Sequence, residues 1–243
     1  MPGNALLIFL MWAFVAEVIG TMAGFGAATV LTPVASFFMD IKTAVAVVAC
    51  FHLFGNASRL WFFWRDVQWP TVIRFGLPGI VLSVAGAQAS VWLPAQTIRL
   101  VLGGFLIVYA VTEAVGLWTV RVPATTTTLI VGGIVSGFIA GLIGTGGAIR
   151  SVCLLAFGLP QGAYLGTSAL IALAVDATRL PVYVRQQFIP ATMLPIVLGL
   201  TVVAFSGSWT GQRLVRMLAP SRFKQVVVVV LGLMGVKLFV DGW

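Results

Sequence analysis

The amino-acid sequence predicts an all-α polytopic membrane protein made of two homologous halves. Of the 243 residues, 60% are hydrophobic and 8% are charged, whereas a soluble domain carries about 25% charged residues. The apolar residues form runs of membrane-spanning length, and one pattern of small and polar residues occurs twice along the chain. These observations indicate a single membrane domain over residues 1–243.

The apolar runs define the expected helices in order. Two short windows, near 25–39 and 146–157, directly follow glycine clusters. They are short for a bilayer, so we expect half-helices, re-entrant turns or tilted spans. Eight other windows come close to the roughly 20 residues that a spanning helix needs, and they lie near 5–22, 43–63, 71–92, 97–118, 126–143, 163–183, 190–212 and 223–240.

The two glycine clusters, GFGAA at 24–28 and GTGGA at 144–148, are expected to break helices inside the membrane. Glycine lowers helix stability, and non-helical backbone is tolerated at this depth only where protein or a water-filled cavity surrounds it. Broken helices in corresponding positions of two halves are the best sequence indicator of a transporter's substrate site.

The two clusters belong to an internal repeat with a shift of 120 residues. One shift relates many positions, so chance is a poor explanation, and the halves are about 1–120 and 121–243. The matching pairs are Gly24 with Gly144, Gly26 with Gly146, Asn56 with Asp176, Ser58 with Thr178, Arg59 with Arg179, Arg65 with Arg185, Pro70 with Pro190 and Gly79 with Gly199. Beyond Gly79 the register drifts by several residues.

The net charge of +8 comes mainly from basic residues at the window ends, where they face anionic headgroups. The lipid bilayer is therefore an expected partner and nucleic acid is not. If both short windows cross, Lys and Arg divide 8 against 5 between the two sides, with Arg150 omitted; if both are re-entrant, they divide 7 against 6. The positive-inside rule favours the larger difference, hence five crossings per half and inverted halves.

Polar residues at membrane depth are costly and usually functional. His52, Asn56 and Arg59 are spaced i, i+4, i+7 and share one helix face. The second half carries Asp176 and Arg179 at i, i+3, an expected ion pair, whereas Asn56 leaves Arg59 without such a carboxylate. Arg59 then either extends to the headgroups or faces a cavity and binds an anion.

The two breaks predict an anion-binding pocket. Helices that start after Gly26 and Gly147 present backbone N–H groups and a positive dipole end. Arg150 lies one turn past Gly147, and Thr145 lies within the break. The alternative is that these glycines only permit close helix packing.

The candidate substrate-binding residues are Gly24, Gly26, Asn56, Arg59, Thr145, Gly146, Gly147, Arg150, Thr167, Ser168, Asp176 and Arg179. The polar uncharged members either line the pocket or bond neighbouring helices. Glu17 and His52 are candidate ion-coupling groups. With one His and two separated cysteines, neither a metal nor a cofactor is expected. A homo-oligomer stays possible.

The glycine breaks, the segment Gly166-Thr167-Ser168-Ala169, the pair Asn56 and Asp176, and the eight apolar windows resemble the sulfite exporter TauE/SafE family of bacterial permeases. The resemblance covers nearly the whole chain, although GFGAA at 24–28 is less glycine-rich than its counterpart. It implies a multi-pass protein of the bacterial inner membrane that exports small sulfur-containing anions such as sulfite or sulfoacetate.

Two function classes follow. The preferred one is a secondary transporter of a small anion, driven by an ion gradient, because no GxxxxGK[ST] motif is present and the loops are too short for an ATPase domain. The alternative is a membrane thiol–disulfide conduit that uses Cys50 and Cys153. Against it, the two cysteines are 103 residues apart and are not equivalent in the repeat.

Overall fold

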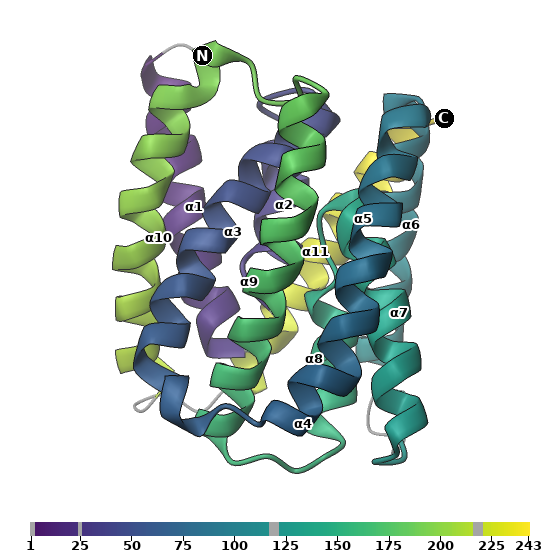
Figure 1. The fold of residues 1–243 in the computed structure, drawn as a ribbon. Coiled ribbons are helices and arrows are strands. Elements are labelled where there is room, and N and C mark those ends of the chain that lie inside the picture. Colours follow the sequence, from purple (N-terminus) through teal and green to yellow (C-terminus); the bar gives the residue numbers. More distant parts are fainter. Residues whose placement is uncertain (1–2, 24–25, 117–121, 216–220) are drawn as a thin grey trace.

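The computed structural model describes residues 3–23, 26–116, 122–215 and 221–243, and within these every regular element is a helix (Figure 1). The all-α prediction is confirmed. The long helices are α1 (Gly3–Ala23), α3 (Ile41–Phe63), α5 (Leu77–Trp92), α6 (Ala95–Ala114), α7 (Thr126–Ile143), α9 (Gln161–Arg185), α10 (Leu194–Val215) and α11 (Ser221–Asp241). The short elements are α2 (Ala28–Ala35), η1 (Trp64–Asp66), α4 (Trp69–Thr71), the π-helical η2 (Val72–Gly76), α8 (Gly147–Leu155) and η4 (Ala191–Met193).

Seven helical stretches among the described residues are long and apolar enough to cross a membrane. They agree with seven of the eight predicted windows, except that the helix expected over 97–118 ends at Ala114. The segment from Trp69 to Trp92 counts as one stretch, because α4, η2 and α5 follow one another without a gap. The eighth window, 223–240, coincides with α11, but the side chains of residues 221–227 lie outside the described set. The eighth span stays a prediction.

Both glycine clusters break a helix, as predicted. Gly144 ends α7 in the left-handed backbone region at φ 83°, and Gly26, which precedes α2, has φ 89°. L-residues with a side chain rarely adopt this conformation. The helices that follow contain 8 and 9 residues, about 12–14 Å of helix against a hydrocarbon core of about 30 Å. They are half-helices, which is one of the alternatives expected for these two windows, and five crossings per half stays a prediction.

The long helices pack in pairs drawn from different halves. The most extensive contacts join α5 to α7, α6 to α11, α1 to α10 and α3 to α9. His52 of α3 meets Asp176 of α9, while Phe63 further along α3 meets Gly166 nearer the start of α9. These two helices are therefore antiparallel.

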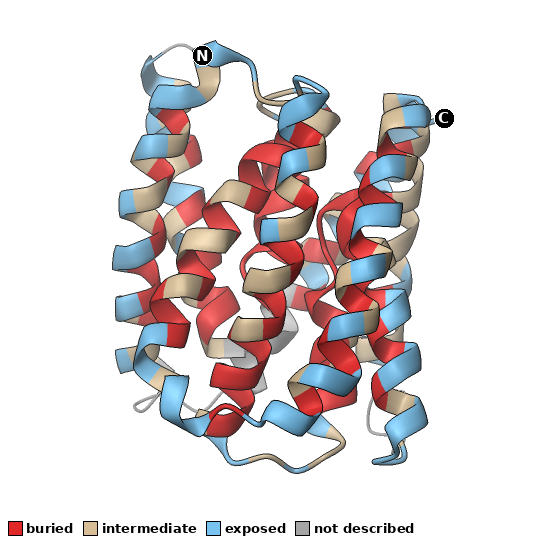
Figure 2. Cartoon of the chain, in the orientation of Figure 1, coloured by how far each residue is buried: buried red, intermediate tan, exposed pale blue. Residues whose placement is uncertain are grey.

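Helices α3 and α9 carry the most buried apolar spans, and α2 is buried along its whole length (Figure 2). Helices α6 and α10 turn much of their apolar surface outward, as expected of helices that face lipid. Small residues let α5 and α7 approach closely, because a Cβ added to Gly137 would lie 2.1 Å from the carbonyl oxygen of Gly79. The break after α7 thus follows a helix that packs closely against α5.

Candidate functional site

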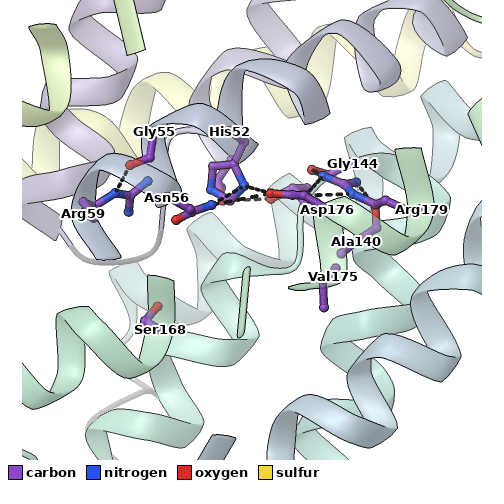
Figure 3. Close-up of polar contacts among 12 residues, drawn as sticks. His52, Gly55, Asn56, Arg59, Ala140, Gly144, Ser168, Val175, Asp176 and Arg179 are labelled. Carbon is purple, nitrogen blue, oxygen red and sulfur yellow. Dashed lines mark hydrogen bonds and ion pairs between the residues drawn. The ribbon is translucent and has the colours of Figure 1, made fainter. Parts of the chain in front are cut away.

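Five charged side chains are buried near the two helix breaks, and each is at most 4% exposed. Charges at membrane depth are costly and are retained where they pair or meet a ligand. Several of these side chains, together with two polar neighbours, form a row from α3 to α9 (Figure 3). The five are Glu17 on α1, Arg59 on α3, Arg150 on α8, and Asp176 and Arg179 on α9.

Asp176 joins the two halves of the chain. Its Oδ1 accepts hydrogen bonds from Nη2 of Arg179 at 2.6 Å and from Nε at 2.9 Å, which confirms the predicted ion pair. Its Oδ2 lies 2.8 Å from Nδ1 of His52 on α3. Because a carboxylate only accepts, Nδ1 carries the proton of this bond. His52 therefore links to Asp176 rather than being a side chain that only fills space.

Arg179 also stabilises the second helix break. Its guanidinium donates to the carbonyl oxygen of Ala140 and, at 3.5 Å, to that of Gly144. Ala140 lies in the last turn of α7, where its carbonyl also accepts from the N–H of Gly144, and Gly144 is the C-cap residue that follows the helix. Tyr183, one turn further along α9, donates to the carbonyl of Gly141. The arginine that the repeat pattern assigned to substrate binding thus has structural partners on several sides.

Arg59 has a carboxylate partner from another helix. Its Nη2 lies 3.3 Å from Oε1 of Glu17, and that oxygen also accepts from Ser208 of α10 at 2.6 Å and from Thr21 at 3.3 Å. Arg59 is 2% exposed, so the interpretation in which it extends to the headgroups is wrong. Asn56 stands three residues before Arg59, where the second half of the chain has a carboxylate. Glu17 of α1, 42 residues away in the sequence, supplies the counter-charge instead.

Arg150 is the buried cation without a carboxylate partner in the described part of the chain. Its Nε donates to Oγ of Ser168 at 2.9 Å, and its Nη2 has no hydrogen-bond partner among the described residues. It lies within electrostatic range of Arg59, Arg179 and Asp176. Three buried arginines therefore face two buried carboxylates, which leaves an excess of one positive charge.

Other buried polar atoms in this region also lack a partner within the described residues. They include Nε2 of His52, Oδ1 of Asn56 and Oε2 of Glu17. The Nε2 atom is directed at Gly26, where an added Cβ would lie 2.4 Å away. Buried polar groups in proteins are nearly always hydrogen-bonded to protein, water or a bound ligand. The arrangement therefore suits a small polar ligand.

The two breaks meet at the interface between the halves. Thr145 of the second break hydrogen-bonds Thr29 of α2 at 2.8 Å. The carbonyl of Gly146 accepts from Ser136 of α7 at 2.8 Å, and α8 begins at Gly147 as predicted. Gly24, also a predicted site residue, lies outside the described residues.

One predicted pocket residue has a different partner. Oγ1 of Thr167 accepts a hydrogen bond from the backbone N–H of Gln68 at 2.9 Å, which ties α9 to the turn after η1. Its neighbour Ser168 contacts Arg150 instead. Sequence reasoning missed Ser208, because it lies beyond the point where the repeat register drifts and a lone serine on an apolar helix carries no distinguishing signal.

Neither redox nor metal chemistry has a cluster to support it among the described residues. Cys50 and Cys153 are both free thiols, and no group of three or more His, Cys, Asp or Glu residues is placed to hold a metal ion there. Cys153 packs against Gly132 of α7, while Cys50 lies on α3.

Comparison with protein-family models matches residues 9–238 to the model described as Sulfite exporter TauE/SafE. No curated protein and no solved structure matches the chain.

Proposed function

Because this chain belongs to the sulfite exporter TauE/SafE family, we propose that it is a secondary transporter that exports a small sulfur-containing anion. Sulfite, sulfoacetate and related organosulfonates are the candidate substrates. The protein moves its substrate across the membrane without changing it chemically, and it draws on an ion gradient. The multi-pass helical structure supplies the membrane domain that such a carrier needs.

The observation that carries this proposal is the unpaired guanidinium of Arg150. A buried charge without a partner costs on the order of several kcal/mol, so such a charge is retained where a ligand offsets the cost. Arginine presents planar, forked N–H donors that suit oxoanions. Its Nε is held by Ser168 and its Nη2 is free within the described residues. A sulfite or sulfonate oxygen would complete this set.

Two further features favour an anion at the same place. Helix α8 starts at Gly147, one turn before Arg150, and its first N–H groups add a positive dipole end. His52 turns a free ring nitrogen toward Gly26 at the other break. The anion would therefore lie between the two half-helices, with Arg150 as its charged partner. His52 would donate to it from Nε2 only in the doubly protonated form, because Nδ1 holds the proton of the neutral ring.

We further propose that the two halves are inverted copies that alternate access to this site. Helices α3 and α9 are equivalent in the 120-residue repeat and pack antiparallel. Helices α6 and α11 behave alike, since Gly103 meets Phe239 while Ala110 meets Gly232. In the repeat, α5 corresponds to α10 and α7 corresponds to α1, and both the α5–α7 pair and the α10–α1 pair are in extensive contact. Antiparallel equivalent helices are what an inverted repeat requires.

Glu17 and His52 remain the candidates for ion coupling. Glu17 neutralises Arg59, and His52 bonds Asp176. A proton gained by either group makes the pocket more positive, so the affinity for an anion changes with the protonation state. That linkage is the property a proton-coupled carrier needs. Glu17→Gln and His52→Gln each test it, and an unaltered pH dependence of transport would exclude the group concerned.

The experiment that tests the proposal measures binding of sulfite, sulfoacetate, thiosulfate and sulfate to the purified protein. A ligand that binds only the folded state raises its melting temperature. We expect at least one sulfur anion to stabilise the parent and not Arg150→Gln, with the exposed Arg185→Gln as the matched control. Equal shifts in all three proteins would refute Arg150 as the anion partner.

A further inference from the structure

A cleft lies on the outer surface of the helical bundle, between α3 and α10. Its volume is about 690 Å³, and its two tryptophans, Trp61 and Trp209, are 84% and 48% exposed. Aromatic and aliphatic side chains make up most of its wall, with two serines. The lining residues are Ala57, Ser58, Trp61, Phe62, Phe205, Ser206 and Trp209.

An adjoining cleft shares one wall with the first. It has a volume of about 770 Å³ and lies between the end of α3 and α9, where Leu173 contributes to it. Ala57, Trp61 and Phe62 line both clefts. Two apolar channels separated by an aromatic ridge on a membrane-facing surface suit the two acyl chains of one phospholipid.

Basic side chains stand at the ends of the helices that border these clefts. Arg213 lies one turn past Trp209 on α10, with its guanidinium carbon 3.6 Å from the centre of the indole ring. It has no carboxylate partner within the described residues. Arg65 lies one turn past Trp61 but stands beside Asp66 in the second cleft. Among the described residues the net charge at this edge is therefore positive, and Arg213 is its principal source there.

We propose that an anionic phospholipid binds here, with its acyl chains in the two clefts and its phosphate at Arg213. Trp and Arg are the side chains that proteins place at the level of lipid headgroups. A positive edge favours an anionic lipid over a zwitterionic one. The site is separate from the buried anion pocket and does not depend on which substrate is transported.

The test uses purified full-length protein and two brominated lipids, phosphatidylglycerol and phosphatidylcholine, whose bromine atoms quench nearby tryptophan fluorescence. We expect the parent to prefer phosphatidylglycerol by about fivefold, the size expected for one basic side chain at a membrane surface. Arg213→Gln should abolish that preference. Arg74→Gln removes an exposed arginine that lines neither cleft and should retain it.

A second variant tests the apolar part of the site. Ser206→Leu places a larger side chain in the cleft from an exposed position on α10, and it should reduce quenching by both lipids. Equal quenching by the two lipids in the parent would overturn the proposal, as would a preference that survives in Arg213→Gln. A dimer that Ser206→Leu dissociates in sedimentation experiments would instead assign the clefts to a second copy of the chain.

Discussion

Replacing Arg150 by glutamine should weaken anion binding without weakening the fold. Its Nη2 has no partner among the described residues and no carboxylate balances its charge there. A hydrogen bond to a charged group contributes about 1.5–3 kcal/mol, so the dissociation constant of the anion should rise by about 10- to 150-fold. In the empty protein, the substitution removes a buried charge that no carboxylate of the described residues offsets. The free energy of unfolding should therefore be unchanged or higher.

Arg179→Gln is the matched comparison, because this arginine is equally buried but fully engaged. It pairs with Asp176 at 2.6 Å and donates to the carbonyls of Ala140 and Gly144. Its loss leaves a buried carboxylate without its main partner, which costs about 3–5 kcal/mol. The two arginines thus have opposite expected effects on stability, although both are buried cations.

The assay pairs two measurements on each purified variant. Calorimetric titration gives the affinity for the anion that stabilises the parent, and circular dichroism during denaturation gives the unfolding free energy. If Arg150→Gln destabilised the protein as much as Arg179→Gln, Arg150 would have a structural partner and the argument for a ligand there would fail. An unchanged affinity for the anion in Arg150→Gln would also refute the argument for a ligand at Arg150.

Three other predictions concern packing and chemistry. Glu17→Gln should lower the unfolding free energy by about 3–5 kcal/mol because Arg59 loses its buried partner, and additive effects in a double-mutant cycle with Arg59→Gln would contradict that pairing. Cys50→Ala combined with Cys153→Ala should leave anion flux in proteoliposomes unchanged, whereas lost flux at normal expression would favour the thiol–disulfide conduit. Gly137→Ala should lower the melting temperature, since overpacking costs about 1–3 kcal/mol and the new Cβ would lie 2.1 Å from a backbone oxygen of α5. An unchanged melting temperature would show that α5 and α7 can separate without cost.

Local features of the fold were predictable because they depend on composition and on neighbours along the chain. Hydrophobic runs predicted all seven candidate spans among the described residues, and the glycine clusters predicted both helix breaks. The ion pair of Asp176 with Arg179 was predictable for the same reason, since i, i+3 residues face each other on any helix. The family could also be identified, because its short motifs lie within these local segments.

The partners of the other buried groups were not predictable from spacing. Arg59 receives Glu17 from a helix 42 residues away, and Ser208 joins them from 191 residues beyond Glu17. Thr167, expected in the pocket, is directed toward Gln68 instead. Which face of each helix meets which neighbour depends on how close α1, α3 and α10 can pack, and no single segment contains that information.

By itself, therefore, the sequence determined an all-helical membrane protein of this transporter family, with two repeated halves and two glycine breaks, because hydropathy and glycine act locally. Only the tertiary structure decided which of the three buried arginines is left without a counter-charge. Asp176 neutralises Arg179 and Glu17 neutralises Arg59, whereas the partner of Arg150 within the described residues is Ser168. That difference depends on distances between side chains of different helices, because the interaction energy of two charges in a low-dielectric interior depends strongly on their separation.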